Sequence, residues 1–122
     1  MKAVPTNHLR DAVADAVESL LSGATLRVGN GRYQNGAPVK PQPSHTNLGN
    51  PILSGIPVTV VRTGNSFVLH ATVAGTSTPL TITEAGVFLQ NGQAVILESF
   101  HPRTIEAPMT HTFKYTIFPG GN

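Results

Sequence analysis

Few side chains in this sequence are suited to acid–base chemistry, and Glu84 has the most unusual surroundings among them. It lies in the apolar stretch 80–89, beside the pair Ala85-Gly86. A carboxylate there needs a partner or water, because an uncompensated buried charge is costly. General acid catalysis would need a second positioned group, and Glu98, on the expected neighbouring strand, offers only a like charge. We therefore expect Glu84 to accept hydrogen bonds from backbone N–H groups or to pair with an arginine.

The five histidines show no spacing typical of a metal site; they are His8, His45, His70, His101 and His111. None forms an H-x-H, H-x-x-x-H or H-E-x-x-H pattern. His70 and His111 fall in expected strands and can approach each other across a sheet, but we interpret such a pair as incidental. The absence of cysteine removes thiolate metal sites and Cys nucleophiles. We expect no metal, no cofactor, no catalytic residue and no enzymatic activity.

The composition indicates one domain with a surface poor in charge. The chain has 122 residues, of which 11% are charged, and its formal net charge is +2; soluble proteins average roughly 25% charged residues. Its basic residues are scattered without a basic run, so we expect no nucleic-acid partner. No apolar run is long enough for a membrane span, and acidic residues interrupt the N-terminal segment where a signal peptide would need an apolar core. Synthesis in a cytoplasm fits these features.

The segment 6–22 is predicted to be an amphipathic helix. Its apolar residues fall at helical spacing on one stripe: Leu9, Ala12, Val13, Ala16, Val17, Leu20 and Leu21. Thr6 or Asn7 can cap its N-terminus, and Asp11 is expected in the first turn, where the helix dipole favours a carboxylate. Gly23 is placed to be the C′ residue.

The segment 29–57 follows a short expected strand at 24–28 and is predicted to be an extended arm. From residue 32 onward it contains five prolines and three glycines and shows neither helical nor strand periodicity. A loop of this length is uncommon inside a compact domain and usually has a function. We expect the arm to lie on a neighbouring subunit, so that deleting residues 36–52 would abolish binding without unfolding the domain. A loose surface loop is the alternative.

Residues 58–118 are expected to form strands only. Gly64-Asn65 and Asn91-Gly92 are two-residue hairpin signals, and the second is a type I′ candidate. Ala85-Gly86 interrupts the alternation and indicates a bulge or a close backbone approach. The expected strands are 58–63, 66–74, 80–89, 93–100 and 111–118, with a connection at 102–108. We expect Phe67, Phe88, Phe113 and Tyr115 in the core.

These elements predict a mainly β protein with one domain over residues 1–122. The expected fold is an antiparallel β-sandwich of the jelly-roll or immunoglobulin-like kind. The N-terminal helix and the Pro/Gly-rich arm are added to it.

Several short motifs follow one another in a characteristic order. They are Thr6-Asn7-His8-Leu9, Leu26-Arg27-Val28-Gly29-Asn30-Gly31, Thr46-Asn47-Leu48-Gly49-Asn50-Pro51-Ile52, Ile82-Thr83-Glu84-Ala85-Gly86-Val87-Phe88 and Ser99-Phe100-His101-Pro102. In this order they resemble a family of small structural proteins of tailed bacteriophages, which carry an "ITE-x-GLF" hairpin. The chain departs from the family after Pro102, where a Lys-Thr turn is common.

The resemblance implies a non-enzymatic component of the virion. We expect a capsid decoration (cement) protein on the outer head surface that binds and stabilises the major capsid protein lattice. A homo-oligomer, with a trimer suited to threefold positions, fits this role. The arm would supply the contact residues Tyr33, Pro38, Pro41, Pro43, Leu48 and Ile52. Two alternatives remain open: a tail, collar, baseplate or fibre-attachment component, and a carbohydrate-binding module for host attachment.

Overall fold

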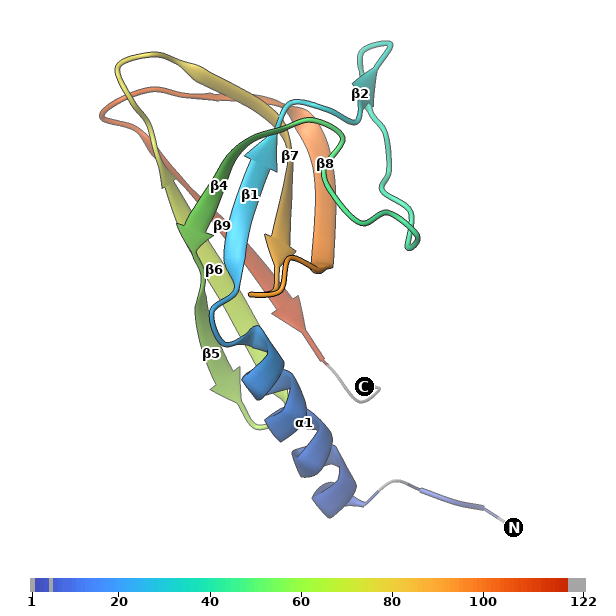
Figure 1. Cartoon of the computed structure of the whole chain (residues 1–122). Coiled ribbons are helices and arrows are strands. Elements are labelled where there is room, and N and C mark those ends of the chain that lie inside the picture. The colour runs from blue at the N-terminus through green and yellow to red at the C-terminus, as the bar shows by residue number, and fades with distance from the viewer. Residues whose placement is uncertain (1, 5, 119–122) are drawn as a thin grey trace.

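A computed structural model describes residues 2–4 and 6–118, which form a mainly β structure with one helix (Figure 1). The helix is α1 (Asn7–Leu21). The strands are β1 (Thr25–Gly29), β2 (Tyr33–Gln34), β3 (Ala37–Pro38), β4 (Pro51–Pro57), β5 (Thr59–Thr63), β6 (Ser66–Ala74), β7 (Leu80–Phe88), β8 (Ala94–Ile105) and β9 (Thr110–Ile117). They pair antiparallel in the orders β4-β1-β7-β8, β5-β6-β9 and β2-β3.

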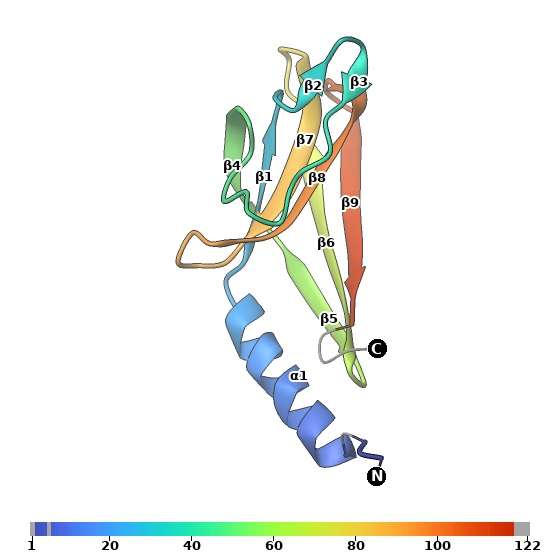
Figure 2. The ribbon, with the colours of Figure 1, turned by 90° about the vertical axis from the view of Figure 1, so that its right-hand side faces the viewer.

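The two larger sheets contribute to a single hydrophobic core. Strand β6 supplies alternate residues, as its sequence predicts: Phe67, Leu69, Ala71 and Val73 are buried. The four-stranded sheet adds Leu26 and Ile82, while Phe113 comes from β9. The chain passes between these sheets three times, from β4 through Val58 into β5, from β6 into β7 and from β8 into β9 (Figure 2). The aromatic residues Phe67, Phe88 and Phe113 are buried as predicted, and Tyr115 is half-buried.

Helix α1 begins and ends at the predicted capping residues. The hydroxyl of Thr6 accepts a hydrogen bond from the N–H of Leu9, and Gly23 has the positive φ of +78° that suits the C′ position. Because the cap is Thr6, the helix starts at Asn7, and the prediction that Asp11 lies in the first turn is wrong. That turn holds no acidic residue.

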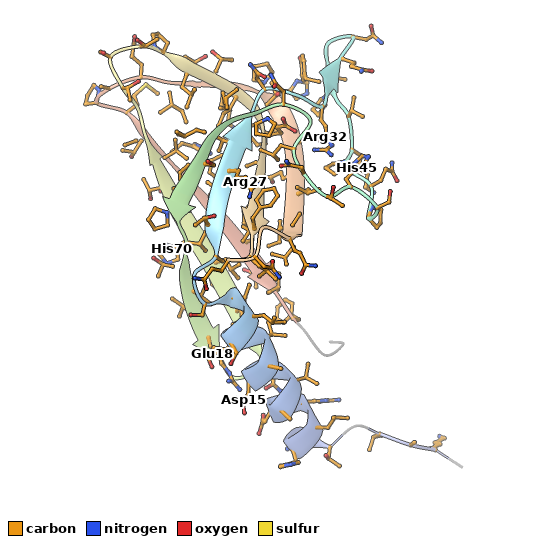
Figure 3. All side chains as sticks on the ribbon, viewed as in Figure 1. Asp15, Glu18, Arg27, Arg32, His45 and His70 are labelled. Carbon is orange, nitrogen blue, oxygen red and sulfur yellow. The ribbon has the colours of Figure 1, made fainter. Side chains whose placement is uncertain are left out.

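The helix is attached to the sheets by one face only. Ala14 and Leu21 are buried, whereas Leu9 and Leu20 remain 54% and 59% exposed. Part of the predicted apolar stripe is therefore uncovered. On the polar side, Arg62 of β5 binds Asp15 at 2.6 Å and Glu18 at 3.0 Å; Figure 3 labels the two acidic residues on α1.

The β7–β8 hairpin differs from the predicted two-residue turn. Type I′ needs a positive φ at both central residues, but Gly92 has φ +90° and Asn91 is not in the positive-φ region. The N–H of Leu89 donates to the carbonyl of Gln93, and the N–H of Gly92 donates to the carbonyl of Leu89. The loop is thus three residues long and ends in a glycine bulge.

Strand β8 continues through the predicted connection at 102–108 as far as Ile105. Its register against β7 shifts so that the stretch Phe100-His101-Pro102 lies opposite the single residue Thr83. This irregularity accommodates the proline, which cannot donate to a regular ladder. Pairing resumes at Ile82 and Arg103. Sequence periodicity does not detect such a bulge, and for this reason it predicts a strand that ends at residue 100 and not at Ile105.

The predicted irregularity at Ala85-Gly86 is a close backbone approach. A Cβ on Gly86 would lie 2.9 Å from the carbonyl oxygen of Ile96 on β8 and 3.0 Å from Phe88. The register shifts themselves occur on either side, between Ile82 and Glu84 and between Val87 and Phe88.

Candidate functional site

The most specialised arrangement in the protein is a segment that crosses one face of the four-stranded sheet. We call residues 30–50 the strap. It lies first beside β8, where the hydroxyl of Ser99 donates to the carbonyl of Val39 at 2.8 Å. It then passes Glu84 of β7 and Arg27 of β1, and it ends where the chain enters β4 (Figure 2). The strap therefore connects a hairpin near one edge of the sheet with the strand that forms the opposite edge.

The prediction of an extended arm over 29–57 is consequently wrong in two parts. Residues 51–57 form β4, which pairs with β1 of the same chain, and residues 33–38 form the β2–β3 hairpin. Strand periodicity fails in β4 because its register against β1 is irregular and Gly55 has a positive φ of +75°. A deletion of residues 36–52 would thus remove part of the four-stranded sheet, and we expect it to unfold the protein.

Glu84 holds the strap through a fully buried carboxylate. Its Oε2 accepts hydrogen bonds from the N–H groups of Gly31 at 2.9 Å and Asn50 at 2.8 Å. Its Oε1 accepts from the N–H of Gly49 at 2.7 Å and from Arg32 Nη1 at 3.2 Å. The expectation that Glu84 accepts backbone N–H groups or pairs with an arginine is confirmed, since it does both. We call this cluster the Glu84 clamp.

The clamp needs glycine at two positions because the backbone segments approach so closely. A Cβ on Gly29 would lie 2.4 Å from the carbonyl oxygen of Asn50 and 2.5 Å from Glu84 Oε2. A Cβ on Gly31 would lie 2.7 Å from the nitrogen of Asn50. Thr83 completes the clamp, because its hydroxyl is buried and donates to the carbonyl of Gly31 at 2.6 Å.

Two arginines extend the clamp along the strap. Arg32 Nη2 donates to the carbonyl of Asn47 at 2.7 Å while its Nη1 holds Glu84. Arg27 lies over the ring of Phe88, 3.9 Å from its centroid, and reaches the side-chain oxygen of Asn47 at 3.4 Å. A cation–π contact of this kind stabilises the Phe88 ring in addition to its burial. Figure 3 labels both arginines, Arg27 on β1 and Arg32 in the strap.

The geometry favours a structural role for Glu84. Each carboxylate oxygen already accepts two hydrogen bonds, and the side chain has no exposed surface. A general acid or base must reach the proton that it transfers, and here the carboxylate faces only its own donors. The chemistry of this constellation is to hold two chain segments together.

The six predicted contact residues differ in their accessibility. Pro43 is exposed and Ile52 is 39% exposed, while Tyr33, Pro38 and Pro41 are partly exposed. Leu48 is only 6% exposed, so its assignment as a partner contact is wrong. It turns inward because its neighbours Gly49 and Asn50 are drawn to Glu84 and its own N–H is bound by Asn47.

The hairpin of the strap also contacts β8. The ring of Tyr33 packs edge-on against His101, with centroids 5.9 Å apart. A cleft of about 440 Å³ lies between the strap and β8, lined by Lys40–Pro43, His45 and Ala94–Leu97. A neighbouring cleft of about 510 Å³ reaches Glu98 and Tyr115. The Tyr115 hydroxyl donates to Glu98 at 2.8 Å and so joins the two larger sheets.

The histidines do not come together as a group. His70 pairs with Lys114 and His111 with Val73, which places the two histidines on opposite faces of the sheet, so the incidental pair foreseen from the sequence does not form. His111 instead contacts Arg103 and the ring of Phe113. Burial, reinforced by the Arg103 charge, lowers the pKa of His111. Within residues 2–4 and 6–118 no three His, Asp or Glu side chains are close enough to bind one metal ion.

No family model matches the chain, and no curated protein matches it. In the part of the chain that the structure describes, no helix has the length and apolar character needed to cross a membrane.

The structure brings three separate sequence motifs together at the clamp. Gly29-Asn30-Gly31, Leu48-Gly49-Asn50 and Thr83-Glu84 lie far apart in the sequence but share the same hydrogen bonds. Sequence reasoning singled out each motif but did not connect them. The available signal was an acidic residue in an apolar strand together with two glycine-containing turns that expose N–H groups.

Proposed function

We propose that this protein is a non-enzymatic structural component of a tailed-phage virion, and specifically a capsid decoration protein that binds the major capsid protein. The observation that carries the proposal is the convergence of the family-like motifs on the Glu84 clamp. A clamp of this kind fixes the path of a surface segment, which is what a protein needs when it presents a preformed contact to a lattice. Preformed contacts avoid the cost of ordering a loop on binding.

We also propose that the two larger sheets pack face to face as a β-sandwich of the jelly-roll or immunoglobulin-like kind. Buried residues from both sheets in one cluster support this arrangement. In such a fold the strap covers one outer face, and helix α1 extends from one end.

The proposed contact surface combines the exposed part of the strap with the start of β4. It consists of Pro41, Pro43, Val39 and Ile52, with Tyr33 and Pro38 at the hairpin. Burying apolar surface of this kind contributes about 25 cal/mol per Å² before ordering costs. A second candidate surface is the uncovered apolar side of α1, where Leu9 and Leu20 are exposed. It would suit contact between copies of the protein.

The first test is the copy number of the protein in purified particles, measured by quantitative mass spectrometry against the major head protein. A number equal to, or a simple fraction of, the head protein supports a decoration protein. A few copies per particle would contradict it and indicate a tail, collar or baseplate component. Absence from particles would overturn the virion assignment, and binding to a glycan array would then test the carbohydrate-binding alternative.

The second test compares two exposed aliphatic residues on different sheets. Ile52→Ser alters the proposed contact surface, whereas Val61→Ser alters β5, where the side chain is 47% exposed. Each full-length variant is mixed with particles that lack the protein, and co-sedimentation is measured. We expect Ile52→Ser to weaken binding and Val61→Ser to leave it unchanged. Equal binding by both variants, with intact folding, would exclude this surface.

A further inference from the structure

The sequence contains three Asn-Gly pairs, at Asn30-Gly31, Asn35-Gly36 and Asn91-Gly92. Asn-Gly is the dipeptide most open to succinimide formation, since glycine has no side chain to shield its backbone nitrogen. We propose that Asn35 is a site of spontaneous modification to aspartate and isoaspartate, and that the fold protects Asn30 and Asn91. This proposal does not depend on the proposed function.

The reaction requires the nitrogen of the glycine to reach the side-chain carbonyl carbon of the asparagine. Solvent hydroxide takes the proton of the Gly36 N–H, and the nitrogen attacks Cγ of Asn35. The new C–N bond closes a succinimide ring while the Cγ–Nδ2 bond breaks and ammonia leaves. Water then opens the ring at either carbonyl, which gives aspartate or isoaspartate. No oxidant or reductant is needed.

The Glu84 clamp blocks this reaction at Asn30. The nitrogen that would attack belongs to Gly31, and its N–H donates to Glu84 Oε2 at 2.9 Å. The side-chain oxygen of Asn30 accepts a hydrogen bond from the Asn50 amide, and the N–H of Asn30 donates to the carbonyl of Asn50. Both reacting groups are thus held in other bonds, and reaction would require the clamp to open.

The turn of the β7–β8 hairpin holds Asn91 in a similar way. The N–H of Gly92 donates to the carbonyl of Leu89 at 2.8 Å. The Asn91 side-chain oxygen accepts from the N–H of Gln93 at 3.0 Å, and its Nδ2 donates to the Gln93 side chain at 3.1 Å. This turn closes a long strand pair, so its opening disrupts more than one local bond.

Asn35 differs from both because nothing of this kind restrains it. Among the described residues no hydrogen bond to its side chain is present, and apart from the adjoining residues no atom lies within 4 Å of the position that a Cβ on Gly36 would take. The β2–β3 hairpin around it has only two residue pairs, Tyr33–Pro38 and Gln34–Ala37. Its contacts with β8, through Tyr33 and Val39, lie at the base of the hairpin and not at the turn. A two-stranded hairpin of this size is marginal, so local opening of the tip, which lets the ring close, costs little.

Modification of Asn35 would alter the hairpin that carries Tyr33 and Pro38. Either product adds a negative charge at the hairpin tip, and isoaspartate also adds an atom to the main chain of a two-residue turn. A two-residue turn determines the pairing of its strands, so ageing of the protein is expected to loosen this end of the strap.

Peptide mapping by mass spectrometry tests the proposal on the full chain incubated natively and, in parallel, in denaturant. In the unfolded chain all three pairs are expected to react at similar rates. In the native protein Asn35 should react within about threefold of its unfolded rate, whereas Asn30 and Asn91 should react at least about tenfold more slowly than when unfolded. Conversion of Asn30 or Asn91 as fast as Asn35, or protection of Asn35 equal to theirs, would overturn the proposal. Asn35→Gln, which forms such a ring far less readily, should abolish the early product without changing the other two sites.

Discussion

The backbone N–H of Gly31 donates to Glu84 Oε2 at 2.9 Å across 53 residues of sequence. This bond attaches the first residues of the strap to the centre of β7. The N–H groups of Gly49 and Asn50 attach its last residues to the same carboxylate. One side chain therefore sets both ends of a surface segment, and several measurements can test how much the fold depends on it.

Replacing Glu84 should destabilise the protein strongly. Glu84→Gln puts an amide N–H₂ where two donors converge and removes the charge that pairs with Arg32. Loss of a buried charged partner costs about 3 kcal/mol or more, and we expect a decrease of that size in the free energy of unfolding. Urea denaturation measures it, with the exposed Glu106→Gln as the control. A change below about 0.5 kcal/mol, as for surface substitutions, would mean that the clamp contributes little.

Adding a methyl group at Gly31 should open the clamp by steric conflict. The Cβ would lie 2.7 Å from the nitrogen of Asn50 and 2.9 Å from Glu84 Oε2. At Gly49 the nearest atom would be the nitrogen of Arg32 at 3.2 Å, a milder contact. We expect Gly31→Ala to lower the thermal midpoint more than Gly49→Ala, with a cost of about 1–3 kcal/mol for overpacking at Gly31. The opposite order would show that the backbone separates easily at this point.

Helix α1 should depend on Arg62 for its attachment to β5. The pKa of Arg62 is raised, first by its hydrogen bonds to Asp15 and Glu18. Arg62→Gln should increase amide hydrogen exchange over the second half of α1, and high salt should reduce the difference between the variant and the parent protein. Arg10→Gln, on the exposed side of the helix, is the control. Unchanged exchange in Arg62→Gln would mean that Ala14 and Leu21 are sufficient to hold the helix.

His111 should make stability depend on pH on the acid side. Its pKa in the folded protein is lowered by burial and by Arg103, so the fold favours the neutral ring. As the pH falls below the ordinary value of 6.5, the unfolded chain binds a proton that the folded chain resists, and stability decreases until the folded protein is also protonated. Above that pH this contribution is constant. When the free energy of unfolding is measured at decreasing pH, His111→Gln should lose less stability than the parent protein. An equal loss would contradict the role given to His111.

Tyr115 should make stability depend on pH on the alkaline side. Burial, followed by the charge of Glu98 and the hydrogen bond to it, raises the pKa of the Tyr115 phenol. Its stabilising effect is complete below the ordinary value of 10.0 and is lost as the pH rises above it, because the unfolded chain then releases a proton that the folded chain retains. Tyr115→Phe should cost about 1 kcal/mol near neutral pH through the lost hydrogen bond and should reduce the alkaline loss. Chemical denaturation at neutral and alkaline pH checks both effects.

The local elements of this protein follow from patterns among neighbouring residues. The spacing of apolar residues and the caps at Thr6 and Gly23 were enough for α1, and alternation was enough for β6, because these signals depend on neighbouring residues. The environment of Glu84 was also predictable, since a carboxylate in an apolar strand requires donors. The donors themselves were not identified.

The path of the strap, and the residues that meet along it, depend on contacts between segments far apart in the sequence. Gly31, Gly49 and Asn50 reach Glu84 through backbone N–H groups, which every residue except proline carries, so the sequence has no distinctive mark for them. Strand β4 and the extension of β8 through Pro102 were missed because bulges disturb the period of two on which strand prediction rests. The proline-rich surroundings of Leu48 suggest exposure and therefore a partner contact, but its neighbours Gly49 and Asn50 are bound to Glu84 and its own side chain is buried.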